Sequence, residues 1–263
     1  MNSNPVFGVV SVYNDNPGKL LKFFSAGYFI FNNSDANEEP LKGLDQVRVM
    51  KNPGHSLYNF ATFIIENYDS LPARLALVKS NIVPRHVESE GALADLLVRE
   101  APQMLWSDST FKSDPISQKM DPPNLFMERN TSWYLRDGDT RPRFFGSFDQ
   151  FEQFIFVKPR RKVWVRFSPG ACYLVSKENV LAAPKELYEF LRFVSSYRFF
   201  PKEAYLVERI LWQVFNPETE FQPRFNNGEW RTDLEQMSPL SVLLASSLSR
   251  IKALVHVLKH RGH

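Results

Sequence analysis

The sequence predicts an α/β fold in which a mainly parallel sheet is flanked by helices. Two patterns in its first eighty residues indicate this. Short apolar runs, rich in valine, isoleucine and phenylalanine, end in polar turn residues, as buried parallel strands do. The four runs are residues 6–13, 27–31, 46–50 and 75–78. Segments suited to helices separate several of them, and such alternation favours parallel strand pairing.

The first half of the chain is the more regular. Residues 6–13 end in the turn sequence Asn14-Asp15-Asn16-Pro17-Gly18, and residues 19–25 could form a short helix. Ser56 has the character of a helix N-cap. The helix expected after it carries Phe60 and Ile64 at helical spacing.

The second half begins with a long excursion over residues 107–147. It contains four prolines and shows weak periodicity, although its aromatic residues suggest that parts of it pack or bind something. Strands are expected at 163–167 and 171–175, around the turn Ser168-Pro169-Gly170. Helices are expected at 185–197, 202–215 and 241–259, with 216–239 irregular. The whole chain, 1–263, is predicted to form a single domain.

Composition narrows the class of protein. A single cysteine, Cys172, cannot form an internal disulfide, and its place in an apolar strand predicts a small buried side chain. The N-terminus lacks the layout of a signal peptide, so we expect a cytoplasmic protein. A net charge of +3 without a dense basic stripe gives no support for nucleic-acid binding.

Polar residues follow the predicted strands where each one ends. These are Tyr13, Asn14 and Asp15, then Asn32–Asp35, then Asn52–Ser56, then Lys79–Asn81. Parallel strands bring their carboxyl ends to one edge of the sheet, where ligands bind in such folds. Each cluster taken singly could instead be an ordinary turn.

These segments resemble glycosyltransferases of the GT-A kind, which have a Rossmann-like sheet. The run Val9-Val10-Ser11-Val12-Tyr13-Asn14-Asp15 resembles their first strand, which often ends in a Tyr-Asn pair beside the nucleotide. Asn33-Ser34-Asp35 falls where such enzymes carry residues near the base and ribose. Asn52-Pro53-Gly54, followed by a helix, is similar to their next turn.

The chain also resembles an uncharacterised glycosyltransferase-like family of fungi, bacteria and large viruses. That resemblance covers residues 6–90 and 163–215. It rests on the order of three segments: Ile65–Pro72, then Pro169–Glu178, then a helix with Glu208 ahead of Trp212 and Phe215.

The resemblance implies a transfer of sugar from a nucleotide-sugar donor to a glycan acceptor. It assigns nucleotide binding to residues 1–100 and acceptor binding to 148–239. The residues expected at the nucleotide are Tyr13, Asn14, Asp15, Asp35, Lys79 and Asn81.

One departure from the GT-A pattern concerns the metal. Lys79-Ser80-Asn81 stands where most members carry an Asp-x-Asp motif for a divalent cation. Lys79 could supply the positive charge directly, so we expect no strict metal requirement. Use of Mn²⁺ or Mg²⁺ stays an alternative, for which Asp108 and Asp114 are the candidate ligands.

The candidate catalytic residue is Glu208, which lies beside the apolar stripe of its predicted helix. An inverting transferase needs a carboxylate to take the proton of the acceptor hydroxyl. The alternative is a structural acid in a salt bridge to Arg209 or Lys202. Glu203 is the weaker second choice, since an acid in a first helical turn is expected from the helix dipole alone.

Three further residues are candidates for substrate binding. His55 precedes a helix, a place suited to phosphate contact. Arg85 and His86 follow the Lys79 segment and could bind the diphosphate or the acceptor. Capping or surface roles are equally open to all three.

The last helix has its own alternatives. From Arg250 to His263 there are four Lys or Arg and no acid, which suits peripheral contact with an anionic membrane. The alternative is a helix docked on the core with a solvated basic end. For the whole protein, a non-catalytic nucleotide- or glycan-binding module and a partner-binding protein also stay open.

Overall fold

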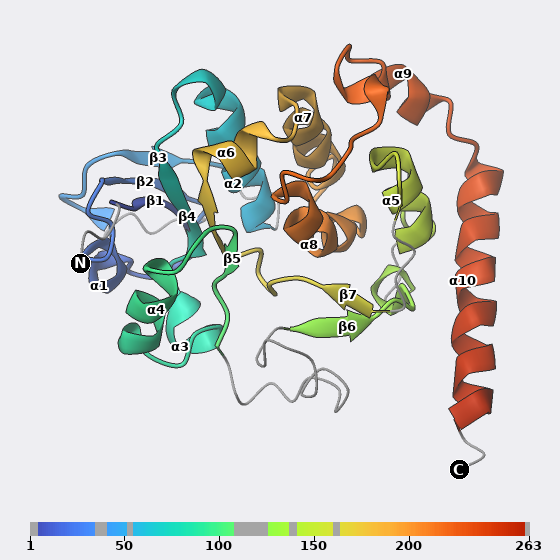
Figure 1. The fold of residues 1–263 in the computed structure, drawn as a ribbon, viewed down its shortest axis with the longest axis horizontal. Coiled ribbons are helices and arrows are strands. Elements are labelled where there is room, and N and C mark those ends of the chain that lie inside the picture. Colours follow the sequence, from blue (N-terminus) through green and yellow to red (C-terminus); the bar gives the residue numbers. More distant parts are fainter. Residues whose placement is uncertain are drawn as a thin grey trace.

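The computed structural model describes residues 5–34, 41–51, 55–107, 126–136, 141–159 and 164–260. Its central element is a six-stranded sheet with helices on both faces (Figure 1). The strands of this sheet are β1 (Phe7–Val12), β2 (Tyr28–Asn32), β3 (Val47–Val49), β4 (Arg74–Lys79), β5 (Gln103–Met104) and β8 (Tyr173–Ser176). Strands β6 (Met127–Arg129) and β7 (Trp164–Arg166) form a separate small sheet.

The strand order of the main sheet is β3-β2-β1-β4-β8-β5. The first four strands pair in parallel, as the alternating sequence predicts. Strand β8 runs antiparallel to both of its neighbours, β4 and β5. The mainly parallel α/β prediction is therefore confirmed, and β8 is an antiparallel insertion that the sequence did not reveal.

The helices differ greatly in length. The longer ones are α2 (Ser56–Glu66), α4 (Glu90–Leu97), α5 (Phe148–Ile155), α7 (Lys185–Val194), α8 (Glu203–Val214) and α10 (Pro239–His260). The shorter ones are α1 (Gly18–Leu21), α3 (Ile82–Arg85), α6 (Lys177–Leu181) and α9 (Trp230–Glu235), with 3₁₀ turns η2 (Tyr68–Ser70), η4 (Trp133–Leu135) and η5 (Pro223–Phe225). None of the helices within the described ranges is long and apolar enough to cross a membrane.

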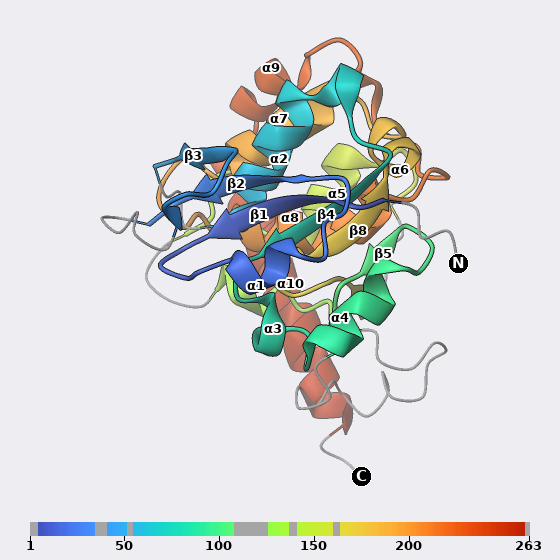
Figure 2. The same cartoon turned by 90° about the vertical axis from the view of Figure 1, so that its left-hand side faces the viewer.

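Alternate residues of each strand enter two different cores. Val9 and Leu77 face the larger core, where α2, α5, α7 and α8 pack. Val10 and Val78 face the smaller core with α1 and α4. Figure 2 shows the sheet between these two groups of helices. Both sides of β1 and β4 are thus buried, which explains why these strands are apolar at nearly every position.

The strands predicted on either side of the turn Ser168-Pro169-Gly170 are confirmed at 164–166 and 173–176, and they belong to different sheets. Between them, Gly170 and Ala171 have φ of 82° and 58°. Two other local predictions need correction. The segment 216–239 contains the helix α9, whose Trp230 is buried. Ser56 is the first residue of α2 and not its cap, and its hydroxyl donates to the carbonyl oxygen of Gly170 at 3.2 Å.

The described part of the 107–147 excursion packs closely. Tyr134, Phe144 and Phe145 are buried in the larger core, whereas Trp133 is exposed. The expectation that its aromatic residues pack is confirmed for these three. Asp108 and Asp114 lie outside the described residues, as does Asp35.

Candidate functional site

The carboxyl ends of β1, β2 and β4 meet at one edge of the sheet, as predicted. Asp15 Oδ2 accepts a hydrogen bond from Ser80 Oγ at 3.3 Å, which joins the ends of β1 and β4. The backbone N–H of Asn14 donates to Ser34 Oγ at 2.8 Å, which joins the ends of β1 and β2. Asn14 has a φ of 59°, a conformation that asparagine tolerates better than most residues. We call this edge, with Tyr13 and Asn81 at its exposed side, the strand rim.

A buried polar layer lies directly under the strand rim, between β1 and α2. Ser11 Oγ accepts hydrogen bonds from Asn59 Nδ2 at 2.8 Å and from Asn33 Nδ2 at 3.3 Å. The amide oxygens of both asparagines are buried and accept no hydrogen bond from any described residue. Buried polar atoms without partners are uncommon in folded proteins. This layer is therefore a place where a water or a polar ligand group is expected.

The loop before β8 reaches across to the strand rim and closes one side of it. A Cβ at Gly170 would lie 2.7 Å from His86 Nε2 and 3.2 Å from Lys79 Nζ, so any larger residue there would require these side chains to shift. Its φ of +82° favours glycine for the same position. The sequence marked Gly170 only as part of a turn, and its approach to Lys79 became visible in the tertiary structure.

Lys79 is the cation at the centre of this arrangement. It ends β4 and is half-buried. In the part of the chain that the structure describes, its ammonium has no carboxylate within ion-pair distance. Its charge nevertheless acts on His55 and on Glu208. It adds to the effect of burial in lowering the pKa of His55, and it partly offsets the rise that burial causes in the pKa of Glu208. A half-buried cation without a direct partner is suited to an anionic ligand.

Glu208, the predicted base, lies beside this cation on α8. Its Oε1 accepts the backbone N–H of Gly170 at 2.6 Å, and its Oε2 is 3.5 Å from Arg209 Nη1. Burial raises the pKa of Glu208, against the opposing charges of Arg209 and Lys79. The salt bridge to Arg209, which the sequence left as an alternative, is therefore present. The side chain remains 20% exposed, so the carboxylate can still meet a ligand.

Glu203, the second choice, has a structural environment. Its side chain is fully buried, and Oε1 accepts the backbone N–H groups of Arg143 and Phe144 at 2.6 and 2.8 Å. Its Oε2 accepts the hydroxyl of Tyr197 at 2.8 Å. These contacts tie the 141–147 segment to α8.

Arg209 contacts two carboxylates, those of Glu208 and Glu128. It makes two hydrogen bonds to the carboxylate of Glu128 on β6, at 2.7 and 3.2 Å. Its guanidinium carbon lies 3.7 Å from the ring centroid of Tyr134 and 4.4 Å from that of Phe167. Aromatic faces on both sides hold the cation in place. The small sheet and the site are thus joined through one buried arginine.

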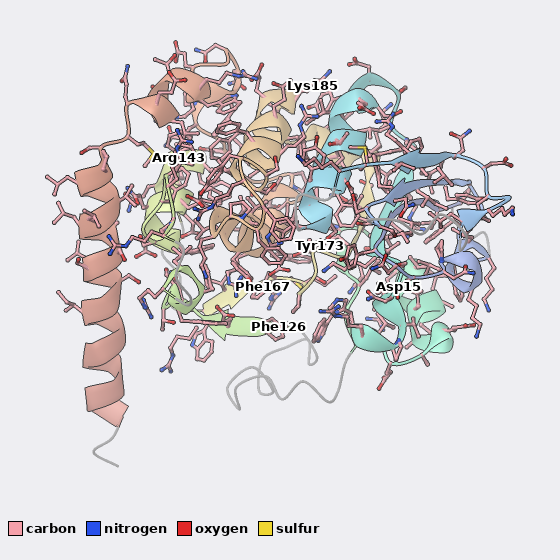
Figure 3. All side chains as sticks on the ribbon, turned by 180° about the vertical axis from the view of Figure 1, so that it is seen from behind. Asp15, Phe126, Arg143, Phe167, Tyr173 and Lys185 are labelled. Carbon is pink, nitrogen blue, oxygen red and sulfur yellow. The ribbon has the colours of Figure 1, made fainter. Side chains whose placement is uncertain are left out.

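Figure 3 shows how these parts lie relative to one another. Asp15 lies on the side of the molecule that carries α3, far from α10. Phe126 and Phe167 lie together beside the small sheet, in edge-to-face contact at 4.9 Å.

His55 precedes α2 at the same edge. Burial, reinforced by the charge of Lys79, lowers its pKa from 6.5 to about 3. The ring is therefore neutral at pH 7 and offers a hydrogen bond but no positive charge to a phosphate. Its Nε2 is buried and has no hydrogen-bond partner among the described residues.

This pKa shift makes stability depend on pH in a definite direction. Between about pH 6.5 and pH 3 the unfolded chain binds a proton at His55 that the folded protein excludes, so stability falls as the pH is lowered. His55→Gln is expected to remove most of this loss, which between pH 6.5 and 5 is about 2 kcal/mol. Melting temperatures at pH 7 and pH 5 measure it. An equal decrease in the variant and the wild type would contradict the assignment.

Arg85 and His86 are placed differently from each other. Arg85 is exposed, while His86 is buried and lies 5.4 Å from Trp106 between ring centroids. Arg85 can therefore reach a ligand in solution, and His86 contributes to the wall beside Gly170.

Phe200 is a site residue that the sequence did not single out. Its ring centroid is 4.0 Å from that of His55, and the side chain is 42% exposed. It has a φ of 53°, a strained conformation for a bulky residue. Such strain is concentrated at functional sites. The aromatic run Phe199-Phe200 before Pro201 was the available sequence signal.

The described residues do not fit a divalent metal site at this edge. No group of three or more His, Cys, Asp or Glu side chains is arranged to hold a metal in the ranges described above. Asp15 contacts Ser80, and Glu208 Oε1 is engaged by Gly170.

A hollow lies at the opposite edge of the sheet from the strand rim. It has a volume of about 790 Å³ and is lined by residues such as Arg74, Glu100 and Glu178, near the start of β4 and the end of β8. Arg74 donates to the carbonyl oxygens of Leu97 and Arg99 there. None of the predicted site residues lines it.

Cys172 is fully buried beneath the site, and burial raises the pKa of its thiol to about 11. The prediction of a small buried side chain is confirmed. A thiol in this state is a poor nucleophile.

Comparison of the chain with protein-family models, with curated proteins and with solved structures returned no match. The class that the structure itself defines is an α/β protein with a mostly parallel six-stranded sheet and a polar, cationic edge.

Proposed function

We propose that this chain is a glycosyltransferase with a GT-A-like domain, which transfers a sugar from a nucleotide-sugar donor to a glycan acceptor. One observation carries the proposal. A half-buried cation at the carboxyl edge of a parallel sheet, Lys79, lies beside a carboxylate with a raised pKa, Glu208. An anion-binding group next to a proton acceptor is the pair that displacement of a nucleoside diphosphate requires.

The donor would lie along the strand rim. Tyr13 is 49% exposed and offers a face on which a base can stack. Asn14, Asp15 and Asn81 supply polar contacts for the ribose and phosphates, and Lys79 supplies charge for the diphosphate. Asp35, also assigned to the nucleotide, lies outside the described residues.

The acceptor would lie on the side of α8. Phe200 presents an exposed ring there, beside His55, which is suited to the apolar face of a sugar. Arg85 is the exposed cation available for polar groups of donor or acceptor.

The chemical step then uses two side chains. Glu208 takes the proton of the acceptor hydroxyl while that oxygen forms a bond to the anomeric carbon of the donor. The bond from the anomeric carbon to the phosphate oxygen breaks, and the nucleoside diphosphate leaves with the electron pair. Lys79 stabilises the charge that develops on it. The raised pKa of Glu208 makes its carboxylate a stronger base than an exposed one.

One finding favours the non-catalytic alternative. Both oxygens of Glu208 already have partners, Gly170 and Arg209, so the carboxylate could serve only to hold the loop. In that case the same edge would bind a nucleotide or glycan without turnover.

Thermal unfolding with a panel of nucleoside diphosphates and sugar nucleotides tests the proposal. A ligand at about a hundred times its Kd stabilises the folded state by about 2.7 kcal/mol. Each kcal/mol raises the melting temperature by roughly 2 to 4 °C at this size. Lys79→Met is expected to weaken nucleoside diphosphate binding by at least about tenfold, because a charge-assisted contact is lost, and to leave the binding of an uncharged nucleoside unchanged.

The matched control is Lys158→Met, because Lys158 is 80% exposed and pairs with Glu220 away from the strand rim. It should behave as the wild type. A melting temperature that no nucleotide shifts would refute donor binding. A shift without transfer or hydrolysis would favour the non-catalytic module.

A further inference from the structure

The apolar stripe of α10 faces outward, whereas the apolar stripe of an ordinary surface helix faces the core. Val242 and Ser249 are buried against the body, and the backbone nitrogen of Ser246 lies close to Gly146. The opposite face carries five large apolar side chains, each more than half exposed. They are Leu240, Leu243, Leu244, Leu248 and Ile251. We call this the leucine face.

The docking of α10 on the body is close and specific. A Cβ at Gly146 would lie 1.9 Å from the carbonyl oxygen of Val242, so the helix backbone touches the chain there. Ser249 Oγ donates to the carbonyl oxygen of Thr131 at 3.0 Å and accepts from Arg136 at 3.3 Å. The leucine face is therefore held outward by contacts on the other side of the helix.

Five aliphatic side chains at i, i+3, i+4, i+8 and i+11 form one continuous stripe. Contiguous apolar surface of this kind marks an interaction site. Leu254 and Leu258 continue the same spacing in the sequence.

The charge of α10 distinguishes between the molecules that could cover the leucine face. From Pro239 to His263 the sequence contains four Lys or Arg and no acid. A second copy of the helix would bring like charges together without any acid to pair them. An apolar stripe on a basic helix instead matches an anionic lipid surface, which accepts leucine side chains at its acyl boundary and lysines at its headgroups.

The position of α10 agrees with such contact. Figures 1 and 2 show its C-terminal end extending beyond the other described elements. In Figure 1 it extends toward the side on which α3 lies, and α3 follows the carboxyl end of β4. A membrane bound along the leucine face would lie on the outer side of α10, away from the strand rim (Figure 3).

We propose that the leucine face of α10 binds the surface of an anionic membrane. The helix lies in the plane of the lipid headgroups, with the leucine side chains inserted and the basic residues beside the phosphates. This inference does not depend on the proposed transfer activity.

Co-sedimentation of the full chain with vesicles tests it. We expect binding to phosphatidylcholine vesicles containing about 30% phosphatidylserine, with far weaker binding to pure phosphatidylcholine. The double variant Leu244→Ser/Leu248→Ser should lower the partition coefficient about a hundredfold, roughly tenfold for each leucine withdrawn. Arg250→Gln/Lys252→Gln should lower it on the anionic vesicles alone.

The matched control is Val98→Ser, because Val98 is 64% exposed and lies at the opposite edge of the sheet. It should bind as the wild type does. Equal binding by the leucine double variant, or no binding to anionic vesicles, would overturn the proposal. Sedimentation equilibrium adds a further outcome: a dimer that the leucine double variant dissociates would assign this face to a second copy and overturn the membrane assignment.

Discussion

Glu208→Gln is expected to lower sugar transfer by about a hundredfold or more, the usual scale for loss of a general base. The amide keeps an oxygen that can accept the N–H of Gly170, which Glu208 now accepts at 2.6 Å. The fold and the donor affinity should therefore be retained while the proton acceptor is lost. A transfer assay, a melting curve and a nucleotide-binding measurement together distinguish these effects.

The pH dependence gives an independent readout of the same residue. Because burial raises the pKa of Glu208, the acidic limb of kcat/KM should lie above the ordinary glutamate value of about 4.3. Activity should rise as the pH increases through that limb, since the ionised form is the base. In Glu208→Gln the limb should disappear from the residual activity.

Glu203→Gln is the matched control on the same helix. Glu203 is fully buried and accepts three hydrogen bonds, so its change should lower the melting temperature and leave turnover per folded molecule nearly intact. If Glu208→Gln gave that pattern instead, Glu208 would be a structural residue and the non-catalytic reading would stand.

Arg209→Met is expected to produce the largest loss of stability, about 3 to 5 kcal/mol. Arg209 is 5% exposed and Glu128 is 18% exposed, so removal of the cation leaves a largely buried carboxylate without its ion-pair partner. It also leaves Tyr134 and Phe167 without the guanidinium between them. Urea unfolding followed by fluorescence would measure the difference.

Two variants make the cause of this loss testable. Arg209→Met/Glu128→Gln should recover part of the stability, because the unpaired charge is then removed. Arg48→Met removes another arginine–glutamate pair, in which Arg48 Nη1 donates to both carboxylate oxygens of Glu66 and the side chains are 41% and 42% exposed. That change should cost no more than about 1 kcal/mol. Equal losses in Arg48→Met and Arg209→Met would show that burial of the pair does not matter.

Local sequence was sufficient for much of the first half. The strands at 7–12, 28–32, 47–49 and 74–79 were predicted within two residues, as was the helix that begins at Ser56. Buried parallel strands carry a strong signal because both of their faces are apolar. The helices α7, α8 and α10 were also predicted, since their apolar residues recur at helical spacing.

The sequence missed elements whose signals are short or mixed. The helices α4 and α5 were not predicted, although Ser89 and Ser147 each cap one of them by accepting a backbone N–H. Strand β5 has two residues, too few for any alternation. The strand at 173–176 was found, but its antiparallel place between β4 and β5 was not.

The sequence alone therefore determined the parallel half of the sheet and the polar residues at its carboxyl edge. It could do so because a buried strand and the polar turn that follows it are both visible in a short run of neighbouring residues. The tertiary structure decided that Gly170 lies against Lys79 and that Glu208 holds it, since these residues are far apart in the chain and meet only when β8 pairs with β4. It also decided which side of α10 faces outward. A helical pattern shows that a leucine stripe exists, whereas only the packing of Val242 and Ser249 on the body shows that the stripe is left exposed.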